Sequence, residues 1–166
     1  MNYLINLKEK KKIFLKKENL YYLIIVSLIF FFDRFSKSKI ISNFNENIYY
    51  INDYVNFNLI WNIGIGFGFL STSSSLFYNL ITFIIGTVII LLFNILIRSE
   101  NIDKFIYSVI IGGALGNFYD RLVYKAVPDF IDLHFNNFHW FTFNLADIFI
   151  TVGIIIFIIK SFFIKN

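Results

Sequence analysis

The sequence has 166 residues and a net charge of +4; 57% of its residues are hydrophobic and 21% aromatic, and the mean hydropathy is +0.66. This length fits one domain, and the long uncharged apolar runs exclude an ordinary soluble fold, because they are typical of segments buried in a bilayer. The absence of cysteine excludes disulfides, thiol nucleophiles and thiolate metal sites, and a histidine-based metal site is not expected from two histidines, His134 and His139.

A first membrane helix is predicted near residues 19–40. Six lysines within residues 1–18 precede the apolar run Leu20–Phe32. A cleavable signal peptide begins in the same way, but charged residues rather than a small-residue cleavage site follow this run. The positive-inside rule therefore places residues 1–18 in the cytoplasm. This lysine cluster also explains the positive net charge, so we expect no nucleic-acid partner.

Residues 41–75 contain no lysine or arginine, as expected of an external loop. Within this loop, Val55, Phe57, Leu59 and Trp61 alternate with residues that include three asparagines. This period of two predicts a strand. A small β element on the outer membrane surface follows from the pattern.

Three further spans are predicted, at Leu76–Ile97, near residues 105–124, and near residues 141–162. The third span of the chain contains Gly112–Gly116, small residues that permit close helix packing. A second outer loop follows it and carries Pro128, Asp129 and Asp132. Four spans place both termini in the cytoplasm and make residues 1–166 a single all-α membrane domain with a small external β element.

Carboxylates recur at one depth in these helices. Two uncharged runs, Leu20–Phe32 and Ile148–Ile159, are shorter than the roughly 20 residues that a span needs, so neighbouring charged residues must enter the membrane. At about 1.5 Å per residue, Asp33, Asp120 and Asp147 each lie roughly 20–24 Å from the cytoplasmic boundary. Charged groups there cost several kcal/mol and indicate a functional site. The alternative is that they are paired helix-end residues at the interface.

The sequence neighbours of these aspartates differ. Lys37 follows Asp33 by four residues and can pair with it on the same helix face, so a structural role for Asp33 stands beside a functional one. Asp120 has Arg121 and Asn117 as candidate partners, which favours a supporting role.

Asp147 has Asn144 one turn earlier and no cation nearby in sequence, and Asp129 also lacks a basic neighbour. Two close carboxyls in apolar surroundings share one proton, because both cannot ionise. One can then activate water while the other protonates a leaving group. Asp129 and Asp147 are therefore the preferred pair.

Five motifs follow one another along the chain. They are Asp33-Arg34-Phe35-Ser36-Lys37, Asn62-Ile63-Gly64, Gly112-Gly113-Ala114-Leu115-Gly116-Asn117-Phe118-Tyr119-Asp120-Arg121, Val127-Pro128-Asp129-Phe130 and Phe143-Asn144-Leu145-Ala146-Asp147. Over residues 20–162, the chain thereby resembles the lipoprotein signal peptidase family, also called signal peptidase II.

The resemblance implies a bacterial inner-membrane aspartyl protease with four transmembrane helices and a small extracytoplasmic β-cradle, its active site toward the outer face. It implies cleavage of prolipoproteins before a cysteine that carries diacylglycerol, by water and without metal or cofactor, with the acyl chains in the bilayer between helices. Its catalytic pair corresponds to Asp129 and Asp147. The residues expected to bind substrate or brace the site are Asn62, Asn117, Asp120, Arg121, Asn144, Asp33 and Lys37.

Three positions depart from the family pattern: Arg34 replaces the usual glutamine, Ile65-Gly66 replaces a pair of small residues, and Pro128 stands where valine is commoner. None removes a catalytic residue, although the region of Gly66 borders the substrate cleft in the family. Two other functions remain as alternatives. One is a small transporter or channel with the aspartates as a proton or cation relay; the other is a non-enzymatic assembly partner that tolerates Asn at both Asp129 and Asp147.

Overall fold

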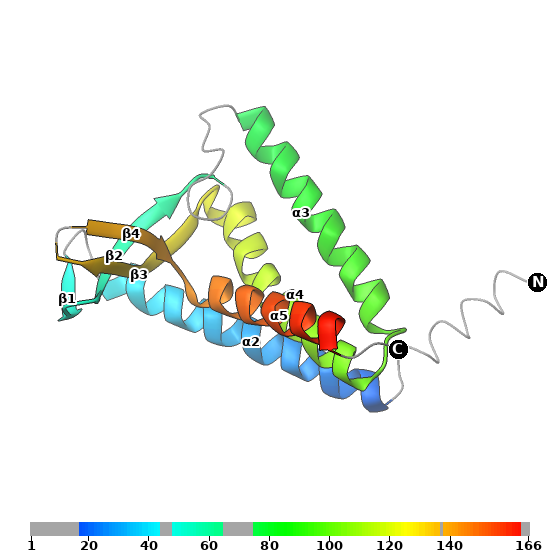
Figure 1. The fold of residues 1–166 in the computed structure, drawn as a ribbon. Helices are drawn as coiled ribbons and strands as arrows, with labels where there is room; N and C mark the ends of the chain where they lie inside the picture. Colours follow the sequence, from blue (N-terminus) through cyan, green and yellow to red (C-terminus); the bar gives the residue numbers. More distant parts are fainter. Residues whose placement is uncertain (1–16, 44–47, 65–74, 137, 164–166) are drawn as a thin grey trace, which may run out of the picture.

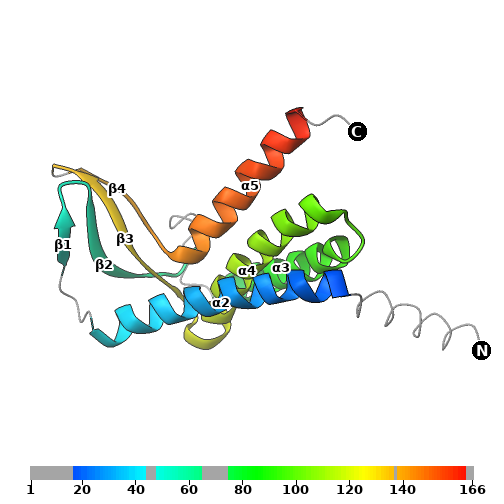
Figure 2. The same cartoon turned by 90° about the horizontal axis from the view of Figure 1, so that it is seen from below.

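The computed structural model describes residues 17–43, 48–64, 75–136 and 138–163. The described elements are, in order, α2 (Lys17–Asn43), β1 (Tyr49–Asn52), β2 (Val55–Asn62), α3 (Ser75–Leu96), α4 (Asn101–Tyr124), β3 (Val127–Phe135), β4 (Phe138–Phe143) and α5 (Leu145–Phe163). The four strands form one antiparallel sheet in the order β1-β2-β3-β4. The sheet lies at one end of the helices, and the start of α2 and the end of α5 lie at the other (Figure 1, Figure 2).

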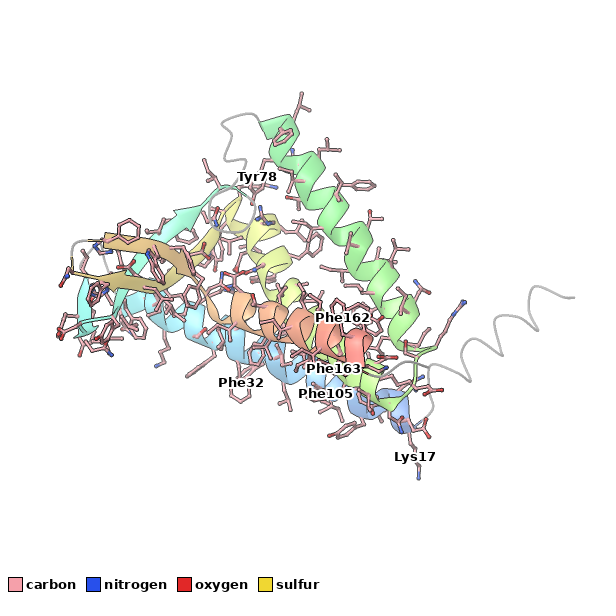
Figure 3. The ribbon with its side chains drawn as sticks, in the orientation of Figure 1. Lys17, Phe32, Tyr78, Phe105, Phe162 and Phe163 are labelled. Atoms are coloured by element: carbon pink, nitrogen blue, oxygen red, sulfur yellow. The ribbon has the colours of Figure 1, made fainter. Side chains whose placement is uncertain are left out.

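Three described helices are long and apolar enough to cross a membrane: α2, α3 from Leu76, and α5. Their outer surfaces are apolar; for example, Phe32, Phe162 and Phe163 are exposed and stand on the outside of the helices (Figure 3). An apolar exterior of this kind is suited to lipid rather than to water.

Helix α4 is the central helix, because it packs against α2, α3 and α5. Its glycines make these approaches possible. A Cβ atom on Gly112 would lie 2.7 Å from Ile29 Cβ of α2, and one on Gly113 would lie 2.6 Å from the Ala146 carbonyl oxygen of α5. The predicted role of this small-residue segment in helix packing is therefore confirmed.

The strand predicted from alternation coincides with β2 (Val55–Asn62). The second outer loop, however, is not a loop, since its residues form β3 and β4 and complete the sheet. The first four residues of β3, Val127–Phe130, are all buried. Both faces of the strand are covered there, so the sequence shows no period of two.

The start of the last helix also differs from the prediction. Phe141 and Phe143 belong to β4, and α5 begins at Leu145 rather than near residue 141. Aromatic residues fit the end of a strand as well as the start of a membrane helix, so hydropathy alone does not separate the two.

Candidate active site

Charged and amide side chains are buried where the helices meet the sheet. They come from α2, α4 and β3 and from the residue before α5: Asp33, Lys37, Asp120, Arg121, Asp129 and Asn144. Isolated charges in such a place would be strongly unfavourable, so their partners decide what the site can do.

The Lys37 ammonium is the centre of one half of this site. Its Nζ lies 2.9 Å from Asp33 Oδ2 and 2.7 Å from Asp120 Oδ2, and it donates to Asn117 Oδ1 at 2.8 Å. The side chains of Lys37 and both aspartates are fully buried. The ion pair between Asp33 and Lys37 is the one that their spacing predicts, and the ammonium donates hydrogen bonds to Asp120 and Asn117.

Asp33 also connects α2 to α5. Its Oδ1 accepts a hydrogen bond of 2.9 Å from the backbone N–H of Ala146, in the first turn of α5. The first N–H groups of a helix have no partner within it, so this carboxylate satisfies one of them.

The predicted partnership between Asp120 and Arg121 is wrong. Asp120 pairs instead with Arg34 and Lys37 of α2, while Arg121 donates to the Gly64 carbonyl oxygen at 2.5 Å and lies 5.6 Å from the Tyr78 ring centroid. Successive residues on a helix point in different directions, so Asp120 and Arg121 do not face each other.

Arg34 is the bracing residue that the sequence analysis missed. It pairs with Asp120 and its guanidinium lies 4.5 Å from the Tyr119 ring centroid. The available signal was its position in α2 between Asp33 and Lys37, within one helical turn of both.

Asn117 joins the Lys37 cluster to Asp147. Its Oδ1 accepts from Lys37, and its Nδ2 donates to Asp147 Oδ1 at 2.8 Å. Because Lys37 orients the amide oxygen, the amide nitrogen is directed to the carboxylate of Asp147.

Asn144 and Asp147 form a reciprocal cap at the start of α5. The Asn144 N–H donates to Asp147 Oδ2 at 3.1 Å, and the Asp147 N–H donates to Asn144 Oδ1 at 3.1 Å. This is the geometry of a capping box, in which the residue before the helix and the third helical residue satisfy each other. The start of α5 thus fixes the position of the Asp147 carboxyl.

Asp129 projects from β3 and is 3% exposed. Its Oδ2 accepts from Asn62 Nδ2 at 2.8 Å, and its Oδ1 accepts from Asn144 Nδ2 at 2.6 Å. Burial, followed by the negative charge of Asp147, raises the pKa of Asp129 to about 7, and the two asparagine hydrogen bonds oppose the rise. Asp129 is therefore suited to carry a proton near neutral pH.

The sequence-predicted site residues thus lie in one connected network. Asn144 contacts both Asp129 and Asp147; Asn117 leads from Asp147 to Lys37, Asp33 and Asp120. Asn62 connects Asp129 to Gly64: its Nδ2 donates to Asp129, and its Oδ1 accepts a hydrogen bond of 2.8 Å from the Gly64 N–H. The Gly64 carbonyl oxygen in turn accepts a hydrogen bond from Arg121.

Of the positions that depart from the family pattern, Pro128 lies next to Asp129 and opposite Trp61 of β2. A strand tolerates proline only where its missing N–H is not required, and β2 is bulged close to this position. Ile65 and Gly66 lie outside the described residues. Among the residues that the structure describes, no group of three or more histidine or acidic side chains is arranged to hold a metal ion.

The fold and the site define a membrane protein with a hydrogen-bonded pair of carboxyls, one buried and one half-buried, at the junction of its helices and a small sheet. The sequence model of "Signal peptidase (SPase) II" matches residues 25–163. The chain belongs to the signal peptidase II family, as the five motifs predict.

Two relatives illustrate the similarity. The lipoprotein signal peptidase of Pelagibacter ubique (strain HTCC1062) is 47% identical over 147 residues, which cover 87% of this chain and 89% of the relative. That of Francisella tularensis subsp. novicida (strain U112) is 36% identical over 158 residues, or 92% of this chain and 98% of the relative.

The fold is also similar to solved structures of a bacterial membrane enzyme determined by the in meso method. One, at 2.3 Å resolution, has a TM-score of 0.73 and 29% identity, covering 86% of this chain and 87% of the other. A second, at 1.9 Å resolution, has a TM-score of 0.72 and 27% identity, covering 87% and 94%.

Proposed function

We propose that this protein is an intramembrane aspartyl endopeptidase that removes the signal peptide from prolipoproteins, cleaving just before a cysteine that carries diacylglycerol. Its membership of the signal peptidase II family supports removal of signal peptides from prolipoproteins and the class of peptide hydrolase. The observation that supports the aspartyl chemistry is the pair of buried Asp129 and half-buried Asp147, both hydrogen-bonded to Asn144.

The proposed reaction starts with one proton on the pair. The ionised carboxyl takes a proton from water as the water oxygen bonds to the scissile carbonyl carbon. The protonated carboxyl then gives its proton to the leaving nitrogen, and the peptide bond breaks. The pair ends with one proton, the product acid releases another to solvent, and no covalent intermediate forms.

The bracing residues keep this pair in place. Asn62 holds Asp129 and Asn117 holds Asp147, each through an amide nitrogen at 2.8 Å. Lys37, Asp33 and Asp120 orient Asn117 and join α2, α4 and α5. Rate depends on such pre-positioning, because a misplacement of about 1 Å can cost about 100-fold.

The proposed topology has α4 as a fourth span, within a single membrane domain of the bacterial inner membrane. The charges of α4 face partners on other helices: Asp103 pairs with Lys160 of α5 at 2.5 Å, and Lys104 lies 3.8 Å from Glu18 of α2. Paired charges are tolerated inside a helical bundle more readily than lone ones. Both termini are then cytoplasmic, and the sheet and the active site face outward.

The test is cleavage of a synthetic prolipoprotein by the purified protein in detergent. The substrate is supplied with and without the diacylglyceryl group, and mass spectrometry identifies the new N-terminus. We expect cleavage of the modified substrate alone, directly before the lipidated cysteine, and none by Asp147→Asn purified in parallel. A folded wild-type protein that leaves the modified substrate intact would contradict the proposal.

A further inference from the structure

A groove of about 370 Å³ runs between α3 and α4. Its α3 lining follows the three- and four-residue spacing of one helix face and consists of Asn79, Thr82, Phe83, Gly86, Thr87 and Ile90. The α4 lining has the same spacing and consists of Phe118, Leu122 and Lys125. Of the described residues that line the groove, none belongs to the proposed catalytic pair or to the hydrogen-bonded network around it, so the groove is separate from the candidate active site.

Most of this groove is apolar and open to lipid. Phe83, Ile90 and Leu122 line it and are each more than half exposed. A Cβ atom on Gly86 would lie 3.0 Å from the Phe118 ring, so glycine leaves room for this ring beside α3. In a membrane, such a surface is covered by a hydrocarbon chain rather than by water.

One end of the groove is polar. Only residues 97–100 separate α3 from α4, so the two helices run in opposite directions and the start of α3 lies beside the end of α4 (Figure 1). The contact of Tyr78, in the first turn of α3, with Arg121 of α4 agrees with this arrangement (Figure 3). Asn79 and Lys125 therefore lie at the same end of the groove, where α4 leads into β3.

The groove is about as long as one leaflet is deep. Asn79 and Ile90 bound its α3 stripe, which corresponds to a rise of about 16 Å at 1.5 Å per residue. Half of a hydrocarbon core that is about 30 Å thick is close to this length. In the proposed topology the polar end lies at the outer surface, so the groove matches the outer leaflet.

Lys125 gives the polar end of the groove a positive charge. It is exposed, and among the described residues it forms no ion pair. Helix α3 has no charged residue, and Asp120 of α4 pairs with Arg34 and Lys37 instead. A lysine after a helix C-terminus also interacts with the helix dipole, but its exposed ammonium is still accessible to a phosphate. Basic pockets between membrane helices bind anionic lipid headgroups.

We propose that this groove binds one anionic phospholipid of the outer leaflet, with the phosphate at Lys125 and one acyl chain between α3 and α4. The inference rests on the proposed topology and not on the proposed reaction. Since α3 packs chiefly against α4, the bound lipid stabilises the outer half of α3 and, through it, the contact of Tyr78 with Arg121. A second copy of this chain and the substrate are the competing occupants.

The first experiment tests the headgroup. Native mass spectrometry measures binding of phosphatidylglycerol to the purified protein in a neutral detergent, and diacylglycerol with the same acyl chains is the control without phosphate. We expect the wild type to bind phosphatidylglycerol more tightly. Lys125→Gln should raise the Kd for phosphatidylglycerol about fivefold and leave that for diacylglycerol unchanged, whereas Lys125→Arg should bind as the wild type does. Arg98→Gln is the matched control, because Arg98 is exposed beyond the other end of α3.

A second pair of variants tests the acyl-chain part of the groove. Thr87→Phe fills the groove, whereas Val88→Phe places the same ring on the next residue of α3, which is exposed and does not line the groove. The Thr87 hydroxyl donates to the Phe83 carbonyl oxygen of its own helix at 2.9 Å, so its loss leaves the contact between the helices intact. We expect Thr87→Phe to weaken binding of both lipids about tenfold, and Val88→Phe to bind both as the wild type does.

Equal affinity of the wild type for the two lipids would overturn the inference, as would unchanged phosphatidylglycerol binding by Lys125→Gln or by Thr87→Phe. A dimer that Thr87→Phe dissociates would assign the groove to a second copy. Displacement of phosphatidylglycerol from Asp147→Asn by diacylglyceryl-modified prolipoprotein would assign it to the substrate. None of these measurements uses cleavage, so the proposed function stands or fails by its own test.

A photoreactive group at the end of an acyl chain of phosphatidylglycerol gives a readout that does not depend on a variant folding. In the wild-type protein it should crosslink to residues 83–90 of α3 and 118–122 of α4. Crosslinks confined to α2 and α5 would contradict the inference.

Discussion

Asn144 Nδ2 lies 2.6 Å from Asp129 Oδ1, so the residue that precedes α5 also holds the carboxyl that projects from β3. The same asparagine exchanges two hydrogen bonds with Asp147. The start of a membrane helix and the position of a buried strand are thus fixed by one side chain, and both proposed catalytic carboxyls depend on it.

Replacing this asparagine should therefore reduce activity more than stability. Asn144→Ala removes a helix cap, worth about 1 kcal/mol, and it removes a hydrogen bond from Asp129. We expect a small decrease in Tm and a decrease of about tenfold or more in kcat/KM. Asn94→Ala is the control, because the exposed Asn94 amide donates to the Ile90 carbonyl oxygen of its own helix, α3, at 2.9 Å. Wild-type turnover by Asn144→Ala would show that this link is dispensable.

The pH dependence follows from Asp129. Since its pKa rises from 3.8 to about 7 in the folded protein, ionising Asp129 costs more free energy in the folded than in the unfolded state. Its contribution to stability is full below pH about 4 and is lost as pH rises through about 7. The Tm of the wild type relative to that of Asp129→Asn should therefore decrease as the pH rises from about 4 through about 7. The kcat/KM should also fall above pH about 7, as the pair loses its shared proton.

A matched variant checks the cause of this shift. Asp147→Asn removes the neighbouring charge and should lower the pKa of Asp129, as measured from its carboxyl stretching band by infrared spectroscopy. An unchanged titration in Asp147→Asn would mean that the two carboxyls do not interact.

Lys37 should be essential for folding. Lys37→Met keeps the length of the side chain but leaves Asp33 and Asp120 without the ammonium that lies 2.9 and 2.7 Å from them. Breaking a buried ion pair in this way costs about 3–5 kcal/mol, so the variant should unfold at lower temperature or fail to accumulate. Lys39→Met, two residues along α2 and exposed, should behave as the wild type does. Equal Tm values for the two variants would be incompatible with the Lys37 network.

Several parts of this site could be predicted from the sequence because they are local. The spacing of Asp33 and Lys37 predicts their ion pair, and the spacing of Asn144 and Asp147 predicts their contact across one turn. The alternation in Val55–Asn62 predicts β2. Each depends on a periodicity that a few neighbouring residues express.

Other features depend on which elements meet in space. Asp120 is adjacent to Arg121 in sequence, but α2 brings Arg34 and Lys37 to it instead. Strand β3 is covered on both faces at its start, so burial removes the alternation that would have revealed it. Packing between distant segments decides both cases, and single-sequence patterns do not record it.

The proposed topology predicts opposite sidedness for two reporter fusions. Asn52 lies at the end of β1, and Glu100 lies directly before α4. Because residues 1–18 contain six lysines and residues 41–75 contain no basic residue, a fusion at Asn52 should report the outer side and one at Glu100 the cytoplasm. Fusions at the two positions that report the same side would rule out the four-span arrangement.

The central claim is that Asp129 and Asp147 act as one unit, and the most direct test is a double-mutant cycle on cleavage of a diacylglyceryl-modified prolipoprotein. The rates of wild type, Asp129→Asn, Asp147→Asn and the double variant are compared after each protein is shown to be folded. We predict that either single change lowers kcat by about 100-fold or more, and that the double variant is no slower than the slower single variant. Cleavage at the wild-type rate by folded Asp129→Asn or Asp147→Asn, or multiplicative losses in the double variant, would contradict the claim.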